Sequence, residues 1–580
     1  MESTAVASAA PAVHPENADV LGKFRRVVAW AILALYLASV SHHWYISSDS
    51  ALYLLLAKSL SNGEGYAVWG RPHVNVPPGY PAMLAAMMHV GLGDMWWLNL
   101  AMTACGLAAM WFGYKLLQEQ TTSGLAMLVA VTVAVGAEMH QRSVQQLSDV
   151  PFMLLVMAGL WCYSRGMRDG RLCLELGTVV LISSCWVRVV GIPLVLAAAL
   201  GLAFEAPQIT RRRAWLNAGG AVLGVCFTSV FFYLATRQAQ GQLAPASYAH
   251  HFTTLSQRSL GSWLFQPLSN FFETGSHLTR LFTGQKCPRT VALVTVWMPT
   301  LLGMWVHLRR RQYVGVVATA GYIGAVLLLR ELLSRYLLPV APLLVMFFFE
   351  GVRELVEMVS RLGSRVTLQR TLRRGVAGPE PKPDAQAGVW SGESFARASG
   401  LCRSPEQRVF ALCALVLVAM NLPKDLRLIY QLHHPRFEEV CDEGWPPMLE
   451  AARFLAEQAP DGDRFVSSAD GRQLSYVSQV PFLELAKSLT RSRPPEDIVL
   501  ADLAEEGVRI FVFGRGEAPP YYQVLEDAVQ SSQGIVVVFE NSRYRIYAQA
   551  ESSKTARRSA FQTAPARLAG SGGQAMSGRD

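Results

Sequence analysis

The stretch VVAWAILALYLASVSHHWYISSDSALYLLLAK, residues 27–58, joins an apolar run to a second helical segment through a polar turn. The first part, residues 27–45, has the length and composition of a helix that crosses a bilayer. Asp49 follows at the edge of that run, where taking a charge out of water costs free energy. Asp49 therefore either caps the next helix or faces a protected cavity in which a carboxylate performs chemistry.

The whole chain has the composition of a membrane protein. Hydrophobic residues make up 51% of its 580 residues and charged residues only 16%, which is low for a soluble domain. The net charge of +9 requires no nucleic acid, because arginines between apolar runs anchor membrane helices on the cytoplasmic side. We predict a polytopic α-helical protein, integral to the plasma (inner) membrane, with the lipid bilayer as a partner and no nucleic acid.

The basic clusters also set the orientation of the predicted helices. Treating them as cytoplasmic gives about eleven transmembrane helices, with the N-terminus inside and the C-terminal domain outside. A count of about 12 or 13 shorter spans remains an alternative. The apolar piece 81–91 is too short to span, so we predict a re-entrant or interfacial helix there. The predicted spans are residues 27–45, 97–115, 122–138, 149–166, 172–188, 189–205, 214–236, 290–308, 312–330, 336–350 and 406–422.

Changes in composition along the chain predict its domains. We expect a disordered N-terminus (1–22), a transmembrane domain (23–425), a small extracytoplasmic α/β domain (426–550) and a disordered tail (551–580). Within the transmembrane domain, residues 46–94 form the first outer loop and residues 351–405 a flexible cytoplasmic loop. Apolar alternation and helical periodicity predict strands at 464–468, 509–514, 534–540 and 542–548, with helices at 451–458, 496–506 and 520–529.

Several common functional motifs are missing from the sequence. It has no Walker A loop, no glycine-rich dinucleotide motif, no HExxH and no GxSxG, and its nine cysteines lack metal-ligand spacing. We therefore assign no metal site and no certain cofactor, and the sequence leaves open whether a divalent cation assists.

The residues after the first span follow a helical pattern. Asp49, Tyr53 and Ala57 are four residues apart, and the segment NVPPGYPAMLAA (75–86) comes further along the same outer loop. The predicted threading brings three more ionisable residues to the same depth as Asp49, namely Asp149, Arg188 and Arg335. Such residues are candidates for function because burying a charge without a partner is expensive.

This set of residues resembles the GT-C glycosyltransferases that use polyprenyl-phosphate sugars. The resemblance is to the bacterial branch of the group that contains the dolichyl-phosphate-mannose–protein mannosyltransferases and the aminoarabinose lipid A transferases. It extends to LSDVPFMLLVMAGL (147–160), VRVVGIP (187–193) and SRYLLPVAPLL (334–344). The eukaryotic mannosyltransferases carry Asp-Glu at the catalytic position, whereas Ser50 follows Asp49 here, which favours the bacterial branch and leaves the sugar undecided.

The resemblance implies a membrane glycosyltransferase that moves a sugar, with inversion, from a polyprenyl-phosphate donor to an extracytoplasmic acceptor. The acceptor is a lipid, a glycan or a protein hydroxyl, and Asp49 is the catalytic general base. The alternatives are a glycan polymerase or ligase that uses a polyprenyl-diphosphate donor, and a non-enzymatic transporter or scaffold. The substrate-binding candidates are Asp149, Arg335, Tyr336, Arg188, Arg71, His73 and Tyr53.

Most of these candidates also have a purely structural interpretation. Asp149 is a helix cap if it is not a substrate ligand, and Arg188 pairs with a structural carboxylate. Arg335, whose guanidinium fork suits a phosphate, is otherwise an interfacial anchor. Arg71 and His73 belong to a solvated loop in that interpretation.

Overall fold

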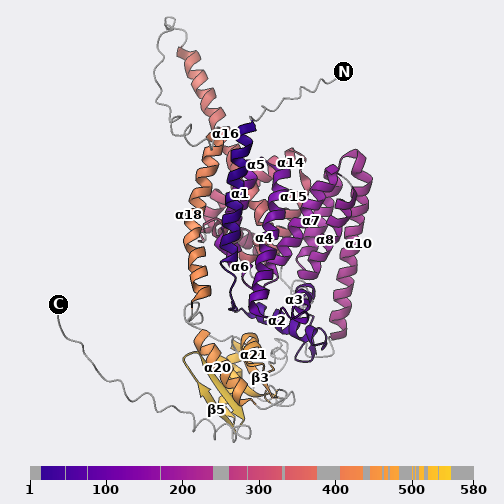
Figure 1. The fold of residues 1–580 in the computed structure, drawn as a ribbon, viewed down its shortest axis with the longest axis vertical. Coiled ribbons are helices and arrows are strands. Elements are labelled where there is room, and N and C mark those ends of the chain that lie inside the picture. The colour runs from indigo at the N-terminus through magenta and orange to yellow at the C-terminus, as the bar shows by residue number, and fades with distance from the viewer. Residues whose placement is uncertain are drawn as a thin grey trace, which may run out of the picture.

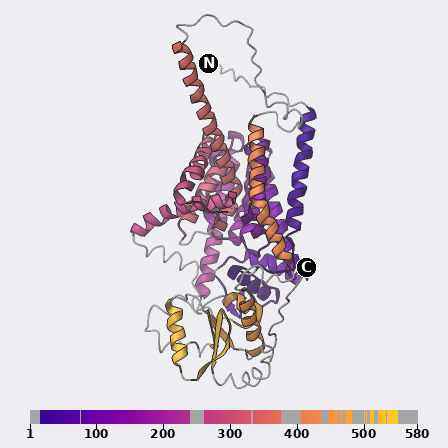
Figure 2. The same cartoon turned by 90° about the vertical axis from the view of Figure 1, so that its left-hand side faces the viewer.

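The structure is a computed structural model, and Figure 1 shows a bundle of long helices with a small α/β unit at one end. Two short helices, α2 (Ser48–Ser61) and α3 (Gly79–His89), lie between the bundle and this unit. Figure 2 shows the same order from the side, with α1 along one side of the bundle and the sheet beyond its lower end. The described residues are 15–45, 47–74, 76–169, 171–239, 260–283, 285–329, 334–374, 405–434, 445–459, 463–467, 471–481, 500, 503, 508–514, 520–532 and 534–549.

The bundle has one large apolar core, in which Phe152, Tyr163 and Phe347 are fully buried. A π-helical turn, η1 (Leu293–Trp297), joins α13 to α14, and a 3₁₀ segment, η2 (Ser334–Val340), precedes α16. The helices of the bundle are α1 (Pro15–Leu37), α4 (Met95–Gln120), α5 (Ser123–Ala134), α6 (Ala137–Ser143), α7 (Asp149–Asp169), α8 (Arg171–Val187), α9 (Gly191–Glu205), α10 (Gln208–Ala239), α12 (Leu260–Thr283), α13 (Arg289–Ala292), α14 (Met298–Arg309), α15 (Tyr313–Leu327), α16 (Ala341–Arg374) and α18 (Pro405–His433).

Several of these helices have the length and apolar composition of membrane spans. Among the described residues five do so, or six if the bent pair α5 and α6 forms one span. Three shorter apolar helices lie within α8, α9 and α15. The count of eleven spans and the orientation of the chain therefore stay predictions.

The predicted span 122–138 is a bent pair of helices and not one straight helix. α5 ends at Ala134, and α6 continues after a bend of 61°. Gly136 lies between them, and a Cβ there would be 3.2 Å from the carbonyl oxygen of Leu281 on α12. A side chain at this position would press against α12, so a glycine permits the close packing at the bend.

The ends of the first helix differ from the prediction. α1 begins at Pro15, inside the region 1–22 predicted to be disordered, and proline suits the first turn of a helix because its missing N–H is not needed there. α1 ends at Leu37 and not at residue 45. Residues 1–14 lie outside the described residues, as does the predicted tail 551–580.

Two predicted loops contain helical segments. The predicted flexible loop 351–405 begins as helix, because α16 runs on to Arg374. Glu357 supports this extension by pairing with Arg361 at 2.7 Å, at helical i,i+4 spacing.

α12 lies in the segment that the threading treated as an outer loop. α18 continues past the predicted domain boundary at 425.

A buried polar network connects three helices of the bundle. His140 on α6 shares a 2.9 Å hydrogen bond with the carboxylate of Asp425 on α18, and its other ring nitrogen contacts the hydroxyl of Ser39 after α1. All three side chains are buried. Because an unpaired buried polar group costs about 1–3 kcal/mol, the network fixes how α1, α6 and α18 pack.

The C-terminal unit is a four-stranded sheet in the order β3-β4-β6-β5, with β3 (Arg464–Ser467) parallel to β4 (Val508–Gly514). The other pairs are antiparallel, and β5 (Ile535–Glu540) and β6 (Tyr544–Gln549) form a hairpin. The predicted strands and hairpin are confirmed, as are helices at 451–458 and 520–529, whereas most of 496–506 lies outside the described residues. The helices are α20 (Trp445–Gln458), α21 (Gly471–Ser478) and α23 (Pro520–Ser531).

The sheet has helices on both faces because β4 alternates its side chains. Ile510 and Val512 pack in the cluster that includes α20 and α21. Phe511 and Phe513 point the other way and pack in the cluster that includes α23. This period of two is the geometry of a strand that is covered on both sides.

Candidate active site

Asp49 lies in the first turn of α2 but does not cap that helix. Ser47 is the cap, and its hydroxyl accepts a hydrogen bond from the backbone N–H of Ser50 at 3.1 Å. The hydroxyl of Ser50 in turn accepts from the backbone N–H of Ser47 at 3.0 Å. This reciprocal box satisfies the helix end. The carboxylate of Asp49 is therefore left to make contacts outside α2.

The contact that Asp49 makes is an ion pair with Arg335 on η2. The Nη2 atom of Arg335 donates to the Oδ2 atom of Asp49 at 2.6 Å, across 286 positions of sequence. The carboxylate side chain is 36% exposed and the arginine 16% exposed, so the pair is open to a ligand but largely enclosed. The Nε atom of Arg335 is buried without a hydrogen-bond partner in the described part of the chain.

A second ion pair joins the first residue of α7 to the end of α8. Arg188 donates through Nη1 to the carboxylate of Asp149, and Asp149 is buried. Arg188 thus pairs with a carboxylate, and that carboxylate is itself one of the predicted site residues. A buried charge pair of this kind holds its geometry because removing either partner leaves the other uncompensated.

Tyr336 lies between the two ion pairs. Its ring is 5.2 Å from the guanidinium carbon of Arg188 and 5.5 Å from that of Arg335. Tyr322 donates its hydroxyl proton to the backbone carbonyl of Tyr336 at 2.7 Å and so fixes this turn. Cations over an aromatic face are attracted to it. We call Asp49, Arg335, Tyr336, Arg188 and Asp149 the charged cluster.

Tyr53 links the α2 side of the cluster to the α7 side. It follows Asp49 by one helical turn, and its hydroxyl shares a 2.9 Å hydrogen bond with the hydroxyl of Ser148. Its ring makes an edge contact with Tyr80, with centroids 4.9 Å apart. The structure thus brings five of the eight predicted site residues into direct contact, and Tyr53 joins them through Ser148, the neighbour of Asp149.

Solved structures of similar shape exist. ArnT from Cupriavidus metallidurans, bound to undecaprenyl phosphate, has a TM-score of 0.56 at 14% identity, covering 91% of this chain and 98% of that one. Its apo state has a TM-score of 0.54 at 14% identity, covering 92% and 99%. The oligosaccharyltransferase AglB from Archaeoglobus fulgidus is more distant, with a TM-score of 0.48 at 12% identity, covering 85% and 69%. No family model and no curated protein sequence matches the chain.

The chain has the GT-C fold. The GT-C fold and the class of a helical membrane protein with a small C-terminal sheet were both predicted from the sequence, and both are confirmed. An identity of 14% shows the fold alone, so the arguments for activity rest on the site.

The other two candidates on the first outer loop are less clearly part of the site. His73 is buried, with its ring centroid 6.0 Å from that of Tyr66, and its Nε2 atom has no hydrogen-bond partner among the described residues. Arg71 belongs to β2 (Arg71–Pro72), which pairs with β1 (Ala67–Val68), and its side chain lies outside the described residues.

Nearby charges keep Asp49 ionised. Burial raises the pKa of its carboxyl group, but Arg335, followed by Arg472 and Arg188, outweighs burial and holds that pKa below its usual value. Arg472 comes from α21 of the C-terminal unit. Sequence analysis missed it, because no motif surrounds it and it lies 423 positions after Asp49 in a separate domain.

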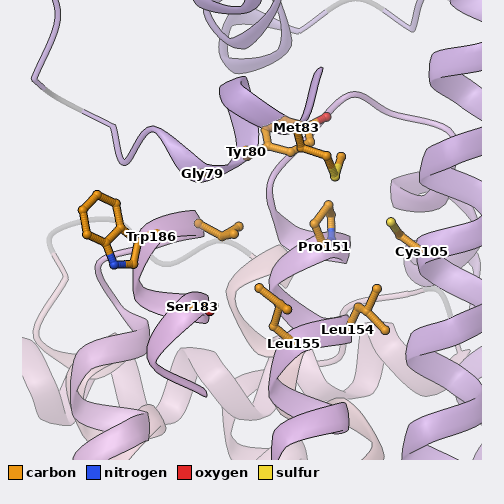
Figure 3. Close-up of a pocket in the computed structure, with 10 residues that line it drawn as sticks. Gly79, Tyr80, Met83, Cys105, Pro151, Leu154, Leu155, Ser183 and Trp186 are labelled. Atoms are coloured by element: carbon orange, nitrogen blue, oxygen red, sulfur yellow. The ribbon is translucent and has the colours of Figure 1, made fainter. Parts of the chain in front are cut away.

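An apolar cavity of about 380 Å³ lies between α3, α4, α7 and α8. Figure 3 shows Trp186 and Cys105 on opposite sides of it, with Pro151 between them and Tyr80 above. The cavity is connected to the site through Tyr80, which lines it and whose ring contacts that of Tyr53. Its volume is within the range of small-ligand sites, about 300–1,000 Å³.

The last feature of the site is the arrangement of side chains that could bind a metal ion. In the parts of the chain that the structure describes, no group of three or more His, Cys, Asp or Glu side chains is placed to hold a metal ion.

His73 should make folding stability depend on pH. Burial, and then the charge of Arg472, lowers the pKa of His73 from 6.5 to about 3. The unfolded chain therefore binds more protons between these values, and stability should fall as pH drops below about 6.5, by up to about 1.4 kcal/mol per pH unit. We expect the thermal midpoint to drop less in His73→Gln than in wild type between pH 7.5 and 5.5, because glutamine does not titrate. Equal drops in both proteins would contradict this assignment.

Proposed function

We propose that this protein is a membrane glycosyltransferase that moves a sugar from a polyprenyl-phosphate donor to an acceptor hydroxyl, with Asp49 as the general base. The observation that carries the proposal is the contact of Asp49. Ser47 caps α2, so the carboxylate of Asp49 is available, ionised, and paired with Arg335 at 2.6 Å. A carboxylate beside a guanidinium fork supplies both groups that this reaction needs.

The reaction requires little more than these two groups. The acceptor oxygen attacks C1 of the sugar, and its proton passes to the carboxylate of Asp49. The bond between C1 and the phosphate oxygen breaks, and its electron pair leaves on that oxygen. One displacement inverts the configuration at C1, so the second carboxylate that a retaining glycosidase needs as nucleophile is not required.

The two arginines of the charged cluster are suited to the phosphate. A guanidinium presents several N–H groups in a plane and binds phosphate oxygens through two parallel hydrogen bonds. Arg335 has a buried Nε atom without a partner among the described residues, which is a donor available to a ligand. We assign Arg335 to the departing phosphate, with Arg188 and Tyr336 beside it and Asp149 orienting Arg188.

The apolar cavity is suited to the lipid part of the donor. Its lining includes Met83, Leu154 and Leu155, and Tyr80 connects it to Tyr53 of the site. ArnT, which shares the fold, was crystallised with undecaprenyl phosphate. We place the first isoprene units of the donor in this cavity, so that the phosphate lies at Arg335 and C1 of the sugar near Asp49.

One experiment in cells tests both the identity of the acceptor and the class of the donor. Mass spectrometry of lipids and envelope glycans from cells with and without the protein should show one product that lacks the mass of a single sugar. The same cells should accumulate the matching polyprenyl-phosphate sugar. Accumulation of a polyprenyl-diphosphate oligosaccharide would contradict the donor class, and unchanged glycans and lipids would contradict the enzyme assignment.

A further inference from the structure

The C-terminal unit is in direct contact with the helix that carries Asp49. Trp69 on the first outer loop donates through its indole N–H to the hydroxyl of Ser475 at 2.9 Å. Trp44, just before α2, makes an edge contact with the ring of Tyr476, with centroids 4.6 Å apart. Lys58 near the end of α2 donates to the side-chain oxygen of Gln479. The α/β unit therefore lies on the first outer loop.

Two of these three contacts come from α21, and the third comes from the residue just after it. Ser475 and Tyr476 are in α21, and Gln479 follows its last residue. Arg472 precedes Ser475 by three positions and Tyr476 by four. Residues three or four apart occupy neighbouring positions on a helix surface. The face that docks on the outer loop thus includes Arg472, in the turn nearest to the start of the helix.

The charge of Arg472 reaches the candidate site. It lowers the pKa of Asp49, after the effects of burial and Arg335, and it contributes after burial to the low pKa of His73. His73 is buried, and its Nε2 atom has no partner among the described residues. The charge of Arg472 therefore acts on both the carboxylate of Asp49 and the imidazole of His73, whose Nε2 atom is available to a ligand.

We propose that α21 of the C-terminal unit completes the substrate site, and that Arg472 binds an anionic oxygen group of a bound substrate beside Asp49. This rests on the proposed function. The charged cluster contains two carboxylates and two guanidinium groups, which balance each other. With Arg472 the set has one more positive charge than negative charges, which favours a bound phosphate or carboxylate. That anion belongs either to the donor phosphate or to the acceptor.

Binding and transfer assays separate the two sources. In the full-length protein, we expect Arg472→Ala either to weaken undecaprenyl phosphate binding by about tenfold or more, which assigns the anion to the donor, or to leave that binding unchanged and reduce sugar transfer by about tenfold, which assigns it to the acceptor. Arg472→Lys should recover part of the loss in either case. Arg453→Ala, which removes an exposed arginine from α20 of the same unit, is the matched control.

Hydrogen exchange tests whether the effect is only structural. Protection of residues 471–478 and 67–72 should be the same in Arg472→Ala and in wild type. The inference fails if binding and transfer are both unchanged in Arg472→Ala, or if a loss of function is accompanied by loss of that protection. Wild-type protein that does not bind undecaprenyl phosphate would contradict the proposed donor, which is a different failure.

Discussion

Asp49→Asn should slow sugar transfer by orders of magnitude while the protein still folds and still binds undecaprenyl phosphate. Asparagine has almost the same shape and can still accept a hydrogen bond from Arg335, but it cannot take the proton of the acceptor hydroxyl. General-base catalysis contributes about 10²–10⁴-fold to rate, so we expect a loss of that size in kcat. The measurement is single-turnover release of polyprenyl phosphate from its sugar conjugate, together with binding of undecaprenyl phosphate to the variant.

Asp94→Asn is the matched control for this change. Asp94 is also an aspartate of the first outer loop, its side chain is 61% exposed, and it caps α4 by accepting from the N–H of Trp96 at 2.8 Å. Asparagine caps helices as well as aspartate does, so this variant should retain full activity. Wild-type rates for Asp49→Asn would remove the base from the mechanism.

The membrane helices were predictable because a physical length determines them. A bilayer requires about 20 apolar residues per helix, and the runs that became α4, α7 and α10 have that length. The bend at Gly136 was not predictable from the apolar pattern, since it depends on the approach of α12. The segment that forms α12 has a strongly amphipathic sequence, and the positions of the basic clusters had placed it outside the membrane.

The charges of the candidate site were predictable, but their pairing was not. Asp49, Asp149, Arg188 and Arg335 stood out because each interrupts apolar sequence at one depth. Which carboxylate faces which guanidinium depends on how α2, α7, α8 and η2 pack, and Asp49 and Arg335 are 286 positions apart.

Whether Asp49 caps its helix could not be predicted, because the sequence pattern does not distinguish it from its neighbours. Ser47, Ser48 and Asp49 can each cap a helix, and only the observed box between Ser47 and Ser50 decides among them. Arg472 shows the remaining limit, because its effect on the pKa of Asp49 depends on how the C-terminal unit docks on the first outer loop.

Arg335→Ala should weaken the binding of undecaprenyl phosphate and also change Asp49. A hydrogen bond to a charged group is worth about 1.5–3 kcal/mol, which corresponds to a loss of affinity of about 10- to 150-fold. Arg335 is also the largest of the charges that lower the pKa of Asp49. Burial raises this pKa. Without Arg335 fewer positive charges counter the effect of burial, so the pKa of Asp49 should rise.

This double effect gives Arg335→Ala a recognisable pH dependence. If residual transfer is measured against pH, the acid limb should lie at higher pH in the variant than in wild type, because Asp49 protonates earlier as pH falls. Arg335→Lys keeps the charge but loses the guanidinium fork, so it should leave the acid limb near the wild-type position and still weaken phosphate binding. Arg289→Ala, which removes an arginine that is 58% exposed on α13, should change neither. Unchanged affinity in Arg335→Ala would show that the phosphate binds elsewhere in the fold.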